Sequence, residues 1–313
     1  MPVSAKPTKQ GIIVLGLPRS GTTLIRRILN AHPSIACGGE SFLLRATAQF
    51  LRGDTIVDGI DYGVLGGLQS AGFTREEVLS RVRTLAFSFL EDFAAENKKP
   101  RWATKSAVDS FYLPQIEALY ADHAQFVCLV RHGLDTVLSL DDLCVANEVF
   151  IKELHAYVKQ YARPLEAYAH AWRDVTDQLL DFVERHADRA ILIRYEDLVA
   201  NPDAKTAELF GFLGESADAD LLERALEAEM AQGLGDWKTH GRTSIDASSV
   251  GRAADLREDI ISRLAPIMNP TLKKGGYDSA PMKPLPGHDE AIRRYELLMR
   301  FNAARADADS NDS

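Results

Sequence analysis

The hydrophobic and polar positions of this chain fall into short apolar runs separated by segments with helical spacing. Apolar runs rich in β-branched residues occupy 12–15, 125–130 and 190–194, and such runs are typical of strands buried on both faces. A further short strand is expected over 102–105, and apolar residues recur at helical spacing over 24–29. Strands that alternate with helices predict an α/β fold: a parallel sheet flanked by helices on both faces, in a single domain.

The remaining pattern predicts more helices and one unusual segment. Further helices are expected over 40–51, 74–97, 111–120, 150–186, 201–213, 219–231 and 256–274. Thr74 opens the second of these with a capping-box sequence, and Pro164 is expected to kink or break the fourth. The glycine-rich residues 53–72 are predicted to form an ordered loop or lid near an acceptor, or a plain surface connection.

Composition limits the class of protein. The 313 residues, 46% of them hydrophobic, suffice for one domain over 11–280, between a polar tail over 1–10 and a segment over 281–313 that holds an amphipathic helix and a disordered end. A formal net charge of −9 argues against a nucleic-acid partner. No signal peptide or membrane-length apolar run is present, so we expect a cytoplasmic protein that binds no membrane. The three cysteines, Cys37, Cys128 and Cys144, lack metal-ligand spacing, and packing is their expected role.

A glycine-containing loop, Gly16–Thr23, lies between the first strand and the first helix. Such a loop points backbone N–H groups and the positive end of a helix at an anion. Its glycines have the Walker A spacing, but Thr22 stands where Walker A has the lysine that reaches the β- and γ-phosphates of a nucleoside triphosphate. The loop therefore suits a shorter phosphate chain that needs no metal, with Arg19 as a cation inside it. Arg26 and Arg27, on the following helix, are each interpreted as solvated charges.

Two later strands also end in residues that suit an anion. Arg131 follows the strand over 125–130, and Ser139 lies eight residues later on the next helix. A guanidinium group can donate two parallel hydrogen bonds to phosphate oxygens, and a hydroxyl adds a neutral donor. Tyr195 follows the strand over 190–194. Because parallel sheets bind ligands at the carboxyl ends of their strands, we expect these loops to share one crevice.

At these residues a family resemblance is clear. The loop PRSGTT after an apolar strand resembles the 5′-phosphosulfate loop of sulfotransferases that use 3′-phosphoadenosine 5′-phosphosulfate (PAPS). The continuation LIRRILNAHPSIACGGES is most similar to the tyrosylprotein sulfotransferase branch and to bacterial sulfotransferases of that branch. The later segments VRHGLDTVLS, RYEDLVANP and Ser248–Tyr277 resemble further motifs of the family, in the same order.

The resemblance implies a donor, a product and a set of residues that contact them. PAPS would be the donor and adenosine 3′,5′-bisphosphate (PAP) the product, with no metal required. The implied donor contacts are Arg19, Ser20, Gly21, Thr22, Thr23, Arg131, Ser139, Tyr195, Ser249, Gly251 and Arg252. In the protein-tyrosine branch a lysine stands at the position of Arg252, so the charge is kept.

The resemblance also implies catalytic residues. Arg19 would stabilise the leaving phosphate. Lys105 matches the family's basic residue beside the oxygen that bridges the sulfur and the 5′-phosphate of PAPS. Glu40 matches the glutamate of the branch's CGEE-type motif and is the predicted general base, unless it only stabilises a helix start. Ser244, or Thr243 beside it, is expected to support the sulfuryl group, since the branch has a serine in a comparable loop. Small-molecule sulfotransferases use a histidine base, for which His32 and His132 are the rivals, although His32 also suits a helix cap.

The acceptor and two rival functions stay open. The low-charge 53–73 stretch favours a small phenol or alcohol, since only Arg45 and Arg52 suggest a cationic groove for an acidic peptide; a peptide tyrosine remains the alternative. A P-loop kinase acting on a small molecule is the rival enzyme, and a non-catalytic nucleotide-binding protein is the rival class. A homodimer is neither required nor excluded.

Overall fold

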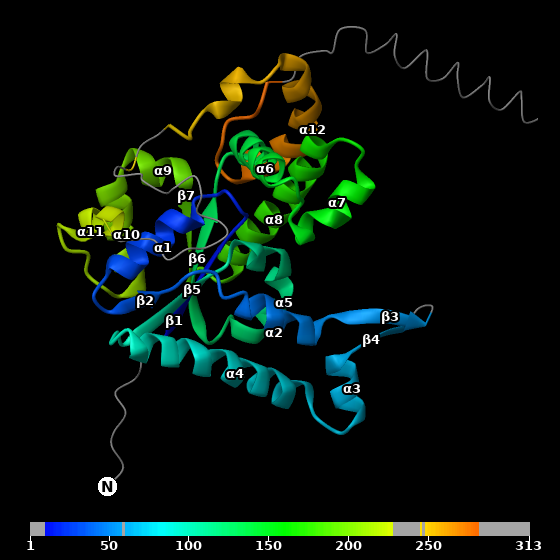
Figure 1. The fold of residues 1–313 in the computed structure, drawn as a ribbon, viewed down its shortest axis with the longest axis vertical. Coiled ribbons are helices and arrows are strands. Elements are labelled where there is room, and N and C mark those ends of the chain that lie inside the picture. The colour runs from blue at the N-terminus through cyan, green and yellow to red at the C-terminus, as the bar shows by residue number, and fades with distance from the viewer. Residues whose placement is uncertain (1–9, 58–59, 228–244, 246–247, 282–313) are drawn as a thin grey trace, which may run out of the picture.

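The computed structural model describes residues 10–57, 60–227, 245 and 248–281, and it is built around five parallel strands (Figure 1). The strands are β1 (Gly11–Gly16), β2 (Ile35–Cys37), β5 (Arg101–Lys105), β6 (Ala124–Val130) and β7 (Ala190–Arg194), in the spatial order β2-β5-β1-β6-β7. The register pairs Ile13 with Thr104 on one side and with Phe126 on the other. The predicted α/β fold with a parallel sheet is therefore confirmed.

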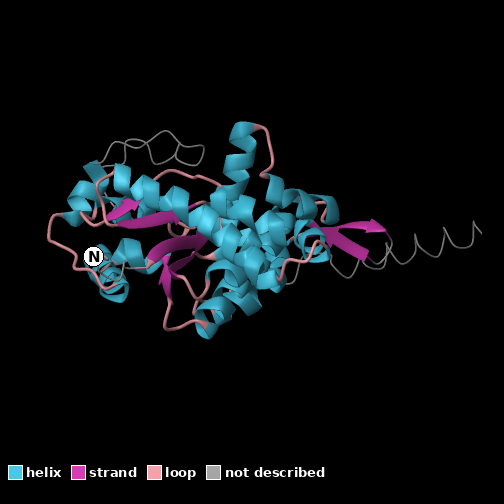
Figure 2. Cartoon of the chain, turned by 90° about the horizontal axis from the view of Figure 1, so that it is seen from below, coloured by secondary structure: helices cyan, strands magenta, loops and turns pink. Residues whose placement is uncertain are grey.

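Helices cover both faces of the sheet. Successive side chains of a strand point to opposite faces, and here the side chains on both faces are apolar and buried. In β1, Ile12 and Val14 belong to the cluster that includes Phe210, whereas Ile13 and Leu15 belong to the cluster that includes Trp172. The first face carries α1 (Thr22–Ala31), α9 (Tyr195–Ala200), α10 (Pro202–Leu213) and α11 (Leu221–Glu227). The second carries α4 (Arg75–Glu96), α5 (Leu113–Tyr120), α6 (Gly133–Asn147), α8 (Pro164–Arg185) and α12 (Glu258–Lys274). Figure 2 shows helices on both sides of the strands.

The glycine-rich 53–72 segment is not a loop. It forms an antiparallel hairpin, β3 (Gly53–Val57) with β4 (Ile60–Gly63), followed by α3 (Val64–Ser70). The hairpin extends away from the sheet (Figures 1 and 2). The missed signal is a pair of runs with high β-propensity separated by Asp58-Gly59, a typical hairpin sequence.

Several helix boundaries also differ from the predictions. The helix expected over 40–51 begins only at Leu43, as α2 (Leu43–Ala48) with a 3₁₀ turn, η1 (Gln49–Leu51), so Glu40 precedes it. A 3₁₀ turn, η2 (Ala107–Tyr112), precedes α5, and another, η4 (Arg252–Asp255), precedes α12. Pro164 starts α8 because a proline at the first helical position loses no hydrogen bond, and η3 (Lys152–Leu154) and α7 (His155–Gln160) come before it.

The capping box predicted at Thr74 is confirmed. Thr74 and Glu77 form the reciprocal hydrogen bonds of a capping box at the start of α4. Within the described part of the chain, no helix combines the length and the apolar character needed to cross a membrane. The amphipathic stretch expected over 288–305 lies outside the described residues.

Candidate active site

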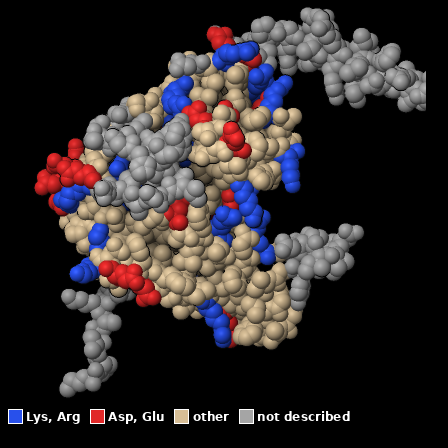
Figure 3. Space-filling model, in the orientation of Figure 1, with Lys and Arg blue, Asp and Glu red and all other residues tan. Residues whose placement is uncertain are grey.

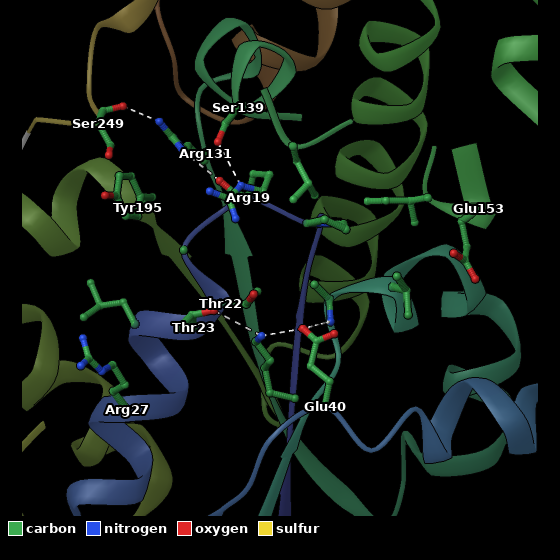
Figure 4. Close-up of a pocket in the computed structure, with 18 of the residues that line it drawn as sticks. Arg19, Thr22, Thr23, Arg27, Glu40, Arg131, Ser139, Glu153, Tyr195 and Ser249 are labelled. Atoms are coloured by element: carbon green, nitrogen blue, oxygen red, sulfur yellow. Dashed lines mark hydrogen bonds and ion pairs between the residues drawn. The ribbon is translucent and has the colours of Figure 1, made fainter. Parts of the chain in front are cut away.

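A cavity of about 620 Å³ opens at the carboxyl ends of four strands. Its lining includes Arg19 after β1, Lys105 at the end of β5, Arg131 after β6 and Tyr195 after β7. The prediction that these loops share one crevice is confirmed. Figure 4 shows Arg19, Arg131, Ser139, Tyr195 and Ser249 grouped at one end of the cavity, with Glu40 and Glu153 away from them.

The loop after β1 is shaped by two residues in the left-handed region. Arg19 has φ 77° and Gly21 has φ 96°. A Cβ atom on Gly21 would lie 2.4 Å from Cδ2 of Tyr195, so only glycine lets the ring pack against the loop. Gly21 is also the N-cap of α1 and gives the helix no side-chain cap, which leaves the first amides without that partner.

Arg131 holds this end of the cavity together. Its side chain is 4% exposed, and its Nη1 donates to the carbonyl of Arg19 at 2.9 Å. Nη2 donates to the carbonyl of Ser249, while Nε is buried and has no hydrogen-bond partner among the described residues. The guanidinium group lies 4.9 Å from the ring centroid of Tyr195. Desolvation lowers the pKa of Arg131 from its ordinary value, and the group stays charged near neutral pH.

The other predicted anion contacts lie around Arg131. The Nε of Arg19 donates to Oγ of Ser139 at 3.0 Å. Arg252 lines the cavity and pairs with Asp142 of α6 at 2.7 Å. The loop before Arg252 is held by the carboxylate of Asp135, which accepts from the backbone N–H groups of Gly251 at 2.8 Å and Ala253 at 3.1 Å. Of the implied donor contacts, Ser20 and Gly251 do not line the cavity.

A carboxylate and an ammonium group meet beside the loop Gly16–Thr23, called the phosphate-type loop from here on. Nζ of Lys105 lies 2.7 Å from Oε1 of Glu40 and 3.4 Å from Oγ1 of Thr23. The Lys105 side chain is 3% exposed and that of Glu40 is 17% exposed. The backbone N–H of Ala107 also donates to Oε1 of Glu40, at 3.5 Å. Because Glu40 lies in a loop ahead of α2, the interpretation as a helix-start glutamate is wrong.

The rest of the cavity lining combines an apolar wall, which the sequence analysis did not identify, with a charged rim that includes the predicted Arg45. The wall includes Phe42, Val108, Leu143, Val149 and Ile151. On the rim, Nε of Arg45 lies 3.1 Å from Oε1 of Glu153. The guanidinium of Arg52 lies 5.4 Å from the ring centroid of Tyr112, which itself donates to Glu153 at 3.2 Å. Lys and Arg side chains gather on this face between the hairpin and the helices above it (Figure 3).

Neither rival histidine lines the cavity. His32 is 4% exposed and stacks on Phe210 with the ring centroids 4.8 Å apart. Its Nδ1 accepts from the backbone N–H of Ser34, and its Nε2 lies 3.2 Å from the carbonyl of Ser216, as suits the C-cap residue of α1. His132 packs edge-on against Tyr277, and burial lowers its pKa.

Two arginines on α1 were interpreted wrongly as solvated. Arg26 is 6% exposed and Arg27 is 8% exposed, and Arg27 lines the cavity. The covering element is α11, whose Leu226 carbonyl accepts from Nη2 of Arg27 at 3.5 Å. The long stem of Arg27 is thus buried between two helices, a contact that local spacing does not reveal.

Two remaining groups of predicted residues complete the picture. All three cysteines are buried, and burial raises the pKa of Cys37 to about 12, which fits packing rather than reactivity. Among the described residues no group of three or more potential ligands is placed to hold a metal ion. Ser244 lies outside the described residues.

Comparison with known proteins identifies what the chain resembles. The model of the sulfotransferase family matches residues 11–219. The protein-tyrosine sulfotransferase of Drosophila melanogaster is 27% identical over 202 residues, which are 64% of this chain and 37% of that protein. Protein-tyrosine sulfotransferase A of Caenorhabditis elegans is 23% identical over 292 residues, which are 87% of this chain and 68% of that protein.

The fold is also found in solved structures. The sulfotransferase domain from the curacin biosynthetic pathway superposes with a TM-score of 0.59 and 20% identity, over 86% of this chain and 99% of that one. The sulfotransferase domain of the Synechococcus olefin synthase gives a TM-score of 0.57 and 21% identity, over 88% and 98%. At these identities the likeness concerns the fold alone.

Proposed function

The chain belongs to the sulfotransferase family and is an enzyme of that family, and from this premise we propose that it transfers a sulfuryl group from PAPS to a phenolic hydroxyl. The observation that carries the proposal is the position of Lys105, whose Nζ lies between Glu40 and Thr23 of the phosphate-type loop. A candidate base, a cation and an anion-binding loop therefore meet at one point of the cavity.

The cavity suits the donor at the end that Arg131 organises. The buried Nε of Arg131 has no hydrogen-bond partner among the described residues, as expected of a donor that binds an anion. We assign the 3′-phosphate to Arg131, Ser139, Ser249 and Arg252, and the 5′-phosphosulfate to Arg19 and the amides of Gly21, Thr22 and Thr23. Tyr195, which packs on Gly21, would border the nucleotide.

The chemistry follows from the residues at the junction. The acceptor oxygen attacks sulfur while its proton passes to the carboxylate of Glu40. The bond between sulfur and the bridging oxygen breaks, and PAP leaves. Lys105 stabilises the charge that develops on the bridging oxygen, together with Arg19 and the loop amides. Positioning and charge stabilisation dominate such a transfer, as in phosphoryl transfer.

A tyrosine side chain of a polypeptide is the acceptor that we propose first. Two relatives that match this chain are named protein-tyrosine sulfotransferases. The cavity opens to a rim on which Arg45 and Lys152 lie, so a phenol could enter while the rest of a chain stays outside.

A small lipophilic phenol is the second candidate, as the sequence analysis favoured. One observation supports it: part of the cavity lining is apolar, with Phe42, Val108, Leu143 and Ile151. Such a wall would bind the apolar part of a free phenol and desolvate it.

A transfer assay with radiolabelled PAPS tests both proposals. The acceptors are a tyrosine peptide, the same peptide with phenylalanine in place of tyrosine, and 4-methylphenol. Label on the tyrosine peptide alone supports the first proposal, and label on 4-methylphenol alone supports the second. PAP binding without transfer to any phenol would contradict the activity proposed here.

A further inference from the structure

The carboxyl group of Asp109 is buried beside the candidate base but takes no part in the proposed chemistry. Asp109 lies on η2, directly after β5, and is 1% exposed. Its Oδ1 accepts from the backbone N–H of Arg45 at 3.1 Å, across 64 residues of sequence. Burying a carboxyl group costs free energy, so a structural role is expected for Asp109 and for its hydrogen bond to Arg45.

The explanation lies in how α2 begins. Its N-cap residue is Phe42, which has no side chain able to cap the helix and adopts φ 54° in the left-handed region. An N-cap side chain normally accepts from the second or third N–H of its helix. Arg45 is the third residue of α2, so Asp109 supplies from another part of the chain the cap that Phe42 cannot.

The same turn holds the segment before α2 at three more points. Oγ of Ser106, which is 0% exposed, accepts from the backbone N–H of Phe42 at 3.1 Å. Lys105 and the backbone of Ala107 contact Glu40 itself. Residues 105–109 therefore contact the segment over 40–45 at Glu40, Phe42 and Arg45.

We propose that Asp109 is a positioning residue: by capping α2 it holds the segment over 40–45 so that the carboxylate of Glu40 stays beside Lys105 and the phosphate-type loop. This inference rests on the proposed function, in which Glu40 is the base. Asp109 acts through Glu40 and touches neither donor nor acceptor.

The hydrogen-bond acceptor of Asp109, rather than its charge, is what positions the segment. The charged groups around it are Glu40, Arg45 and Glu153, and two of these three are also acidic. Burial raises the pKa of Asp109 well above its ordinary value, with Glu40 and Glu153 adding to the effect. An asparagine offers the same acceptor without a charge, so Asp109→Asn should preserve the position and Asp109→Ala should lose it.

The test is a double-mutant cycle with Glu40. Turnover, PAP affinity and melting temperature are measured for Asp109→Ala and Asp109→Asn, each with Glu40 intact and with Glu40→Gln. Since a misplacement of about 1 Å can cost about 10²-fold, Asp109→Ala should lower kcat by about 10- to 100-fold when Glu40 is intact. It should change kcat by less than about threefold in the Glu40→Gln background, because effects through one group are not additive. Asp109→Asn should stay within about threefold of its parent, and PAP affinity should not change.

A contrasting variant separates this effect from general damage to the turn. Ser110, one residue further on, accepts from the backbone N–H of Gly16 at 2.7 Å and so holds the phosphate-type loop. Ser110→Ala should weaken PAP binding and lower turnover by the same factor in both backgrounds. If Asp109→Ala does not fold, Ser106→Ala removes the hold on Phe42 and should show the same dependence on Glu40.

The outcomes are distinguishable. Equal losses from Asp109→Ala in both backgrounds, or a loss in Asp109→Asn as large as in Asp109→Ala, would overturn the positioning role. Full turnover in Glu40→Gln alone would instead refute Glu40 as the base, whatever Asp109 does. A loss confined to the background with Glu40 intact, rescued by asparagine, would support the inference.

Discussion

Nζ of Lys105 lies 2.7 Å from Oε1 of Glu40, although the two residues are 65 positions apart in the chain. Both side chains are largely withdrawn from water. Removing one partner of a buried ion pair leaves the other charge uncompensated, which costs more than the pair itself contributes. Substitutions at Glu40 must therefore separate the loss of a base from the loss of a partner for Lys105.

Glu40→Gln is expected to lower turnover by about 10²–10⁴-fold, the range of general base catalysis, because an amide cannot take a proton. PAP affinity should be nearly unchanged, since Glu40 contacts Lys105 and not the Arg131 end of the cavity. Calorimetry with PAP, melting curves and turnover on one preparation check this. Glu40→Ala is the contrast: it should also lower the melting temperature. Full turnover in Glu40→Gln would mean that the acceptor ionises without a base.

Arg19→Ala is expected to weaken PAP binding by about 1.5–3 kcal/mol, the contribution of a charge-assisted hydrogen bond. The hydrogen bond from Arg131 to the backbone carbonyl of residue 19 does not need the Arg19 side chain, so the fold should persist. Arg131→Ala should weaken binding as well but also lower stability, because it releases the carbonyls of Arg19 and Ser249. The control is Arg257→Ala, whose side chain is 79% exposed. Unchanged PAP affinity in both cavity variants would refute the assignment of the donor end.

Gly21→Ala is expected to weaken PAP binding and to lower the melting temperature. The new Cβ would meet the ring of Tyr195 at 2.4 Å, and φ 96° is unfavourable for alanine. Gly72→Ala is the matched control: φ is 97°, but nothing lies within 4 Å of the new Cβ. If both variants lose the same stability, backbone strain alone explains the effect and the contact with Tyr195 does not matter.

EDTA is expected to leave turnover within about twofold of its value without chelator. The physical reason is that Thr22 replaces the Walker lysine, and in the proposed mechanism Arg19 and Arg131 offset the charge of the donor phosphates. The assay compares turnover after chelation with turnover after adding Mg²⁺ back. A strict need for Mg²⁺ would contradict the proposed mechanism.

The free energy of unfolding of Asp109→Asn, relative to that of the unsubstituted protein, is expected to increase as pH rises above about 4. Burial raises the pKa of Asp109 in the folded state, so the folded state holds its proton more tightly than the unfolded state does. The stability that this proton contributes is fully present below the unfolded pKa of about 3.9 and is lost as pH rises toward the folded pKa. Denaturant titrations from pH 4 to pH 8 measure the difference between the two proteins. A difference that does not change with pH would show that Asp109 is not protonated preferentially in the fold.

Features that depend on neighbouring residues could be predicted from local patterns. Apolar runs predicted β1, β6 and β7, and the glycines of Gly16–Thr23 predicted the turn between β1 and α1. The carboxyl ends of parallel strands meet at one edge, so the meeting of Arg19, Arg131 and Tyr195 followed from the strand pattern alone.

Contacts between segments far apart in the chain could not be predicted from local patterns. Asp109 caps α2 across 64 residues, α11 covers Arg27 across 199, and Lys105 reaches Glu40 across 65. Local propensity placed the start of α2 too early because Phe42 has no capping side chain of its own. Whether a charged side chain is solvated, paired or buried depends on which element packs over it, and that is a property of the assembled fold rather than of local sequence.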